Sequence, residues 1–118
     1  MTLVLFDFQK LEVYIKATAL KSYLHLSIKG QYFDRSIYNQ LQRASLSVIL
    51  NIAEGSGRST KNDRRNFFTI ARASLFECVA IFDLLRQENH LSEEQHKLLV
   101  RNADQISRML YTMIRNLS

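Results

Sequence analysis

Apolar residues recur at intervals of three and four along four stretches of the chain, which is the spacing of one face of an α-helix. The stretches cover residues 8–28, 34–54, 60–89 and 92–117. The pattern is most regular in the last one, whose seam is Leu99, Ala103, Ile106, Leu110, Met113 and Leu117. Four amphipathic helices joined by short corners predict an all-α fold: an antiparallel up-down four-helix bundle in which residues 1–118 form a single domain.

The other three stretches have apolar faces as well. The second has a stripe of Ile37, Leu41, Ala44, Val48 and Ile52. The third has a broad face of Phe67, Ile70, Ala71, Ser74, Cys78, Ile81, Phe82 and Leu85. The first offers two neighbouring stripes, one of Leu11, Ile15, Thr18 and Ser22 and the other of Val13, Ala17, Leu20 and Leu24. We expect these faces to meet in one core.

Residues that start and stop helices lie between the four stretches. Gly30 is expected to end the first helix, and Gly55 with Gly57 the second. Asp34 is a predicted N-cap, as is Thr60, with Asp63 in the first turn after it. The run Ser92-Glu93-Glu94-Gln95 has the form of a capping box before the fourth helix.

The composition agrees with few, long helices. The 118 residues include three glycines and no proline, whereas a β-sandwich or barrel of this length needs many tight turns. The single cysteine, Cys78, cannot form an internal disulfide and is predicted to be a buried small hydrophobe in a reducing compartment.

The sequence predicts a cytoplasmic protein with no membrane partner. No apolar run reaches the roughly 18 residues of a membrane span. The N-terminal run MTLVLFDF has neither the basic region nor the small-residue cleavage site of a signal peptide.

The formal net charge is +5, and its excess lies in one short segment. Residues 58–76 carry five Lys and Arg against one Asp, whereas residues 1–57 have a net charge of +2 and residues 77–118 of −1. A local basic segment suits a phosphate backbone or an acidic partner.

The densest part of this segment, NIAEGSGRSTKNDRR at residues 51–65, contains two of the glycines. It is not a phosphate-binding loop of the Walker type, because the glycine spacing differs, the lysine is missing and the preceding residues are helical. We interpret it as a corner between two helices. The free N–H groups at the start of the next helix, beside Arg58 and Lys61, could still receive an anion.

Metal and cofactor sites are not expected. Glu93 and His96 have the spacing of one ligand pair of a di-iron bundle, but such sites need two pairs and two further carboxylates. The three histidines, His25, His90 and His96, show no spacing typical of joint ligation.

Three polar residues lie near the apolar seams. Asn51 and Glu54 are one turn apart, and Glu77 lies toward the apolar face of the third helix. We predict that Asn51, Glu54 and Glu77 form a structural polar cluster, with Arg58 or Arg72 as its cation. A general acid–base pair is the alternative, but nothing nearby resembles a nucleophile.

The third helix is predicted to carry a second surface. At 100° per residue, Lys61, Arg65, Arg72 and Arg86 fall within an arc of roughly 60°, with Phe68, Phe76 and Val79 on or beside it. This stripe can be a subunit interface that buries Phe68, Phe76 and Val79, a nucleic-acid contact through phosphate pairing and base stacking, or a solvated face.

Several motifs resemble those of a known family. They are Gln42-Arg43-Ala44-Ser45, Ser47-Val48-Ile49, Asn51-Ile52-Ala53-Glu54-Gly55, Gly57-Arg58, Phe68 to Leu75 with Glu77, and Phe8-x-x-Leu11-x-Val13-Tyr14-x-x-Ala17. The chain resembles the bacterial four-helix-bundle proteins that include those encoded in intervening sequences of 23S rRNA genes. The accessory variability protein of diversity-generating retroelements is a more distant relative.

The resemblance implies a homopentameric bundle, from a family without an established enzymatic activity, which binds structured RNA or DNA and, in the retroelement case, a partner protein. The leading hypothesis is therefore a non-enzymatic oligomer that binds nucleic acid. Its candidate residues are Arg43, Arg58, Lys61, Arg64, Arg65 and Arg72. The alternative is a structural or protein-interaction oligomer without a nucleic-acid role.

Overall fold

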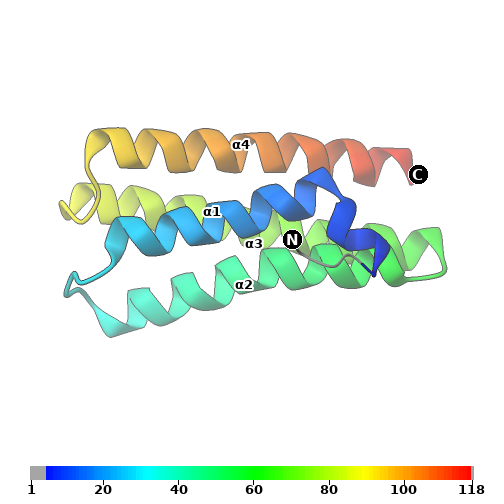
Figure 1. The fold of residues 1–118 in the computed structure, drawn as a ribbon, viewed down its shortest axis with the longest axis horizontal. Helices are drawn as coiled ribbons and strands as arrows, with labels where there is room; N and C mark the ends of the chain where they lie inside the picture. Colours follow the sequence, from blue (N-terminus) through cyan, green and yellow to red (C-terminus); the bar gives the residue numbers. More distant parts are fainter. Residues whose placement is uncertain (1–4, 118) are drawn as a thin grey trace.

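The computed structural model describes residues 5–117, in which four α-helices and one 3-10 turn are joined by short connections (Figure 1). The helices are α1 (Glu12–Ile28), α2 (Arg35–Gly57), α3 (Lys61–Gln87) and α4 (Glu93–Asn116), and the 3-10 turn is η1 (Asp7–Lys10). No strand occurs among these residues. Residues 1–4, which begin the apolar N-terminal run, lie outside the described part of the chain.

The helices run up and down, and each packs against its neighbours in the sequence. α1 contacts α2, α2 contacts α3, α3 contacts α4 and α4 contacts α1, so the four surround one core. In Figure 1, α2 and α4 lie along opposite edges, and α1 and α3 project between them. The predicted antiparallel four-helix bundle is confirmed. None of the helices in residues 5–117 is both long and apolar enough to cross a membrane.

The predicted caps are present with the expected hydrogen bonds. The Asp34 carboxylate accepts from the N–H groups of Ser36 and Ile37 at 2.7 and 3.1 Å. The Thr60 hydroxyl accepts from the N–H of Asp63 at 3.1 Å. Ser92 and Gln95 form the reciprocal capping box, at 3.0 and 2.9 Å. Gly30 has a φ of +79° just after α1, a conformation that costs other residues a steric penalty.

The first helix begins later than its apolar pattern suggests. The Gln9 side-chain oxygen accepts from the N–H groups of Leu5 and Phe6, and this closes η1 as a separate turn. Leu11 then adopts an extended conformation before α1 starts at Glu12. The helical spacing of residues 8–11 therefore comes from a 3-10 turn that packs against α2.

The predicted seams of α2 and α4 are buried in the core, from Leu41 to Ile52 in α2 and from Leu99 to Leu110 in α4. In α1, the stripe of Val13, Ala17, Leu20 and Leu24 is buried, whereas Ile15 is half exposed. In α3, the core face is rotated from its predicted centre, because Phe68 and Leu75 are buried and Ile70 is exposed. Apolar spacing alone therefore did not determine which side of α1 and which side of α3 face the core.

The second helix does not end at Gly55 but continues through Gly57. Gly55 is buried where α2 crosses α3. A Cβ atom built there would lie 2.7 Å from a ring carbon of Phe68 and 3.0 Å from the Cβ of Phe67. Gly55 therefore serves close helix–helix packing, which keeps the glycine inside the helix despite its low helix propensity.

We expect Gly55→Ala to destabilise the bundle by about 1–3 kcal/mol, because the added methyl group must displace the Phe68 ring in a packed core. Gly57→Ala is the matched control, because a Cβ atom there meets nothing within 4 Å. That change should stabilise α2 by up to about 1 kcal/mol through helix propensity. Urea unfolding of the two variants tests the account, and equal effects at both glycines would contradict it.

The single cysteine is buried in the core, as predicted, with a relative exposure of 1%. Burial raises the pKa of Cys78 to about 12, and the Glu77 carboxylate adds to this rise. The thiol is therefore protonated at neutral pH. It is unreactive in this state, because the thiolate is the reactive form.

A disulfide reagent added to the folded protein at pH 8 should label Cys78 at least about a hundredfold more slowly than the urea-unfolded chain, because reaction requires opening of the core. Absorbance of the released thiol measures both rates. Rapid labelling of a protein whose circular dichroism stays native would contradict the buried position of Cys78.

Candidate nucleic-acid interface

One end of the bundle gathers basic side chains. The α2–α3 corner lies at this end together with the start of α1 and the end of α4 (Figure 1). Arg58, Lys61, Arg64 and Arg65 fall within eight residues of this corner, and Asp63 is the one acidic residue among them. Four of the six predicted nucleic-acid-binding residues are therefore brought together.

Arg58 is held on the surface by two contacts. Its guanidinium lies 3.7 Å from the Glu54 carboxylate, one helical turn back, and 4.5 Å from the centre of the Phe67 ring. Both charged side chains are about half exposed. The aromatic contact orients the planar guanidinium, while the exposed pair contributes little to stability.

Arg65 joins two helices at the same end. Its guanidinium donates to the backbone oxygen of Leu117 at 2.8 Å and to the side-chain oxygen of Asn62 at 2.5 Å. A cation at the carboxyl end of α4 satisfies a carbonyl that no helical N–H reaches. Part of the donor capacity of Arg65 therefore serves the fold.

Lys61 and Arg64 complete the corner. Lys61 is the first residue of α3, is exposed, and forms no ion pair within residues 5–117. Arg64 is half-buried, and its Nε atom has no hydrogen-bond partner among the described residues. Lys61 is thus the corner cation whose charge is most available to an external anion.

The two other candidate cations lie elsewhere. Arg43 is exposed on α2, far from the corner, and hydrogen-bonds the Gln40 side chain. Arg72 donates to the backbone oxygen of Ser107 at 3.3 Å, and its guanidinium lies 4.9 Å from the Phe76 ring centre. The centre of the Tyr111 ring lies 5.5 Å from the same guanidinium. The six residues therefore do not form one continuous surface.

The antiparallel topology adds a cation that sequence reasoning missed. Arg115 lies in the last turn of α4, is exposed, and precedes by two residues the carbonyl that Arg65 binds. Counting charge by consecutive segments hid it, because residues 77–118 also contain six acids, none of which lies in the last turn of α4 beside Arg115. The up-down arrangement itself was the signal that could have placed Arg115 beside the corner.

The predicted cluster of Asn51, Glu54 and Glu77 does not form, because both carboxylates are exposed. Asn51 is half-buried and donates to the Ser47 side chain, which in turn hydrogen-bonds Ser74 of α3 at 2.8 Å. Glu54 faces solvent beside Arg58, and Glu77 accepts from Gln40. Of the three, only Asn51 joins the Ser47–Ser74 hydrogen bond between α2 and α3, and the Arg58 guanidinium lies beside Glu54 on the surface, outside any such cluster.

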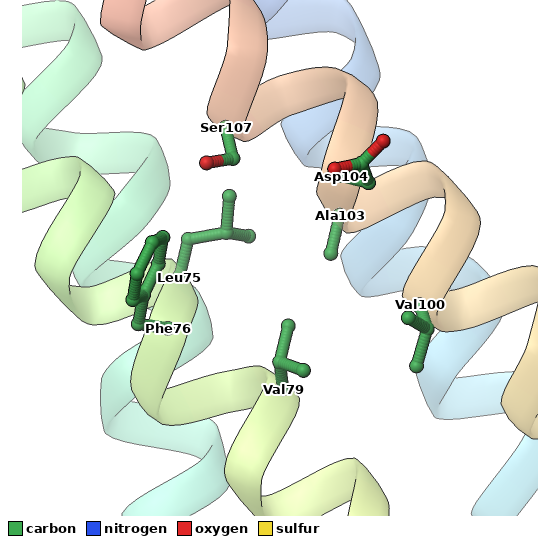
Figure 2. Close-up of a pocket in the computed structure, with 7 residues that line it drawn as sticks. All are labelled: Leu75, Phe76, Val79, Val100, Ala103, Asp104 and Ser107. Carbon is green, nitrogen blue, oxygen red and sulfur yellow. The ribbon is translucent and has the colours of Figure 1, made fainter.

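Of the three predicted interface residues, Phe68 was placed on the wrong surface. Phe68 is 3% exposed and belongs to the core, whereas Phe76 is 55% exposed. Phe76 and the half-buried Val79 line a mostly apolar groove between α3 and α4, of about 250 Å³, with side chains from both helices pointing into it (Figure 2). The groove is lined by Leu75, Phe76, Val79, Val100, Ala103, Asp104 and Ser107.

The histidines and carboxylates do not come together as a metal site. No group of three potential metal ligands occurs among residues 5–117. His96 lies 2.8 Å from the Asp83 carboxylate, a contact between α4 and α3. Glu93 occupies the first turn of α4 and is exposed there.

These features define a small all-α protein, a four-helix bundle with a basic end. The 23S rRNA-intervening sequence protein family matches residues 9–112, and the chain therefore belongs to this family. The family expected from the sequence motifs is confirmed. No curated protein matches the chain.

A solved structure from Bacteroides thetaiotaomicron has a similar fold. It is described as a protein with unknown function from the S23 ribosomal protein family. The TM-score is 0.78 with 21% sequence identity, over 86% of this chain and 97% of that one. At this identity, the likeness shows the fold alone.

Proposed function

We propose that the chain is a non-enzymatic homo-oligomer, a homopentamer by resemblance to its relatives, that binds nucleic acid through its basic end. The observation that carries the proposal is the gathering of Arg58, Lys61, Arg64, Arg65 and Arg115 at one end of the bundle. The resemblance to the 23S rRNA-intervening sequence proteins, which implies binding to structured RNA or DNA, supports the same partner class.

The distribution of the acids supports the same orientation. Glu88, Glu93 and Glu94 lie at the opposite end, around the α3–α4 corner. Arg86 and Lys97 lie at that end as well and offset these acids, so a polyanion is attracted more strongly to the basic end than to the opposite one. The cations at the basic end come from a helix corner and two helix termini, which suits contacts with phosphates rather than the reading of base edges.

The salt dependence of binding to an RNA hairpin tests the proposal. Four or five phosphate contacts predict a plot of log affinity against log salt with a slope of about −4. Fluorescence anisotropy of labelled RNA between 50 and 200 mM salt measures it, and a DNA duplex of the same length shows whether the two nucleic acids are distinguished. Binding that is absent at 50 mM salt would contradict the proposal.

A second candidate function, a structural or protein-interaction oligomer, is favoured by the outer side of α3. The exposed residues of α3 between positions 69 and 80 are Thr69, Ile70, Ala73, Phe76, Glu77 and Ala80. Glu77 is the one charged residue among them, and Phe76 and Ile70 are each about half exposed. Such an apolar side suits a subunit interface, which the first candidate function also requires.

A further inference from the structure

A cleft of about 560 Å³ lies between α1 and α2. Its lining combines aliphatic and polar side chains: Thr18, Lys21, Ser22, Leu24, His25, Leu26, Gln42 and Ile49. The contact between α1 and α2 is less extensive than the contact between α2 and α3. The volume falls within the roughly 300–1,000 Å³ that small-molecule sites occupy.

Lys21 spans the cleft from α1 to α2. Its ammonium group donates to the Gln42 side-chain oxygen at 2.9 Å and to the Ser45 hydroxyl at 2.8 Å. An ammonium group has three hydrogens, so one remains without a partner within residues 5–117. Both partners are neutral, and no carboxylate of the described residues lies within 4 Å of Lys21.

Lys21 is therefore a partly buried cation without a counter-ion. Burial lowers its pKa, which expresses the cost of keeping the charge away from water. A negatively charged group beside the ammonium offsets that cost and takes the third hydrogen bond. The structure thus contains both the charge and the unused donor that an anionic ligand requires.

We propose that the α1–α2 cleft binds a medium-chain monocarboxylate, with the carboxylate on Lys21 and the hydrocarbon chain along Leu24, Leu26 and Ile49. A single ammonium suits a monoanion better than a phosphate dianion. Leu26 is 69% exposed at the rim of the cleft, and a ligand chain lying on it would remove this apolar surface from water.

The chain offers a matched control for the role of Lys21. Lys16 lies on the same helix but faces α4, where it hydrogen-bonds Gln105 at 3.3 Å and lies 3.9 Å from Glu12. Lys21→Met and Lys16→Met remove the same charge from opposite sides of α1. Leu26→Gln alters the rim at an exposed position, so its fold is expected to persist.

Octanoate titrated into the isotope-labelled protein, followed by NMR chemical shifts, tests the proposal. We expect saturable shifts of Thr18, Lys21, His25 and Ile49, at least tenfold weaker binding to Lys21→Met, and unchanged binding to Lys16→Met. Leu26→Gln should weaken octanoate binding but leave the weaker binding of acetate unchanged, and 1-octanol should bind at least tenfold more weakly than octanoate.

Three results would overturn the proposal: shifts that do not saturate, equal affinity for octanol and octanoate, or octanoate binding that survives Lys21→Met. Circular dichroism of each variant establishes that the bundle is folded. If Lys21→Met does not fold, the test rests on two other measurements: octanoate binding to Leu26→Gln and 1-octanol binding to the unmodified protein. The proposal is overturned if both affinities equal that of the unmodified protein for octanoate. RNA binding at the basic end is expected to be unaffected by octanoate.

Discussion

Phe68→Glu is expected to unfold the bundle, whereas Phe76→Glu is expected to leave it folded. Phe68 is 3% exposed and its ring lies against Gly55 at the α2–α3 crossing. Removing a buried phenylalanine side chain alone costs about 3–5 kcal/mol, and a carboxylate buried without a partner adds to this. The sum is comparable with the roughly 5–15 kcal/mol that stabilises a typical domain.

Circular dichroism and thermal unfolding of the two variants measure this difference. Phe76 is more than half exposed, so a carboxylate at this position stays in water and lies within reach of Arg72. If the outer side of α3 is the subunit interface, Phe76→Glu should also lower the mass found by light scattering to that of one folded chain. A folded, cooperative Phe68→Glu variant would contradict the assignment of Phe68 to the core.

Reversing two charges at the basic end should have the largest effect on nucleic-acid binding. For Lys61→Glu with Arg115→Glu, we expect an affinity for RNA roughly tenfold lower at 50 mM salt and a salt dependence weaker by about 0.9 per lost phosphate contact. These two exposed cations are chosen because Arg58 and Arg65 also hold local structure. Fluorescence anisotropy with the same hairpin measures both quantities.

Arg35→Glu with Lys97→Glu provides the control for the charge reversal. Both residues are exposed near the starts of α2 and α4, at the opposite end of the bundle, and the net charge changes equally. This variant should keep the salt slope of the unmodified protein. An equal loss of affinity in both double variants would show that binding follows net charge alone, against an interface at the basic end.

The sequence predicts the fold well because α2 and α4 each have one narrow seam. Ile52 and Leu110 could be assigned to the core from spacing, and caps such as Ser92 fix where a helix starts. In α3, by contrast, the apolar arc is wide, because α2 and α4 each pack more closely against this helix than against α1. Spacing then could not decide whether Phe67 or Phe68 faces the core, and Phe68 was placed on the wrong surface.

The site could be predicted only in part, since it depends on contacts between distant residues. The corner cations are neighbours in sequence and were found by charge counting. That Arg65 binds the end of α4, and that Arg72 binds Ser107, follows only from the packed bundle. The same packing brings Arg115 to the corner and leaves Glu77 in solvent, neither of which residue spacing could reveal.

The central claim, an oligomeric bundle that binds nucleic acid at its basic end, is tested most directly by the mass of the particle in solution. Light scattering coupled to size exclusion should be run with and without the RNA hairpin at 50 mM salt. We predict a multiple of the 13.8 kDa chain that gains the mass of bound RNA, and a smaller gain at the same RNA concentration for Lys61→Glu with Arg115→Glu. A 13.8 kDa particle whose mass RNA does not change would contradict the claim.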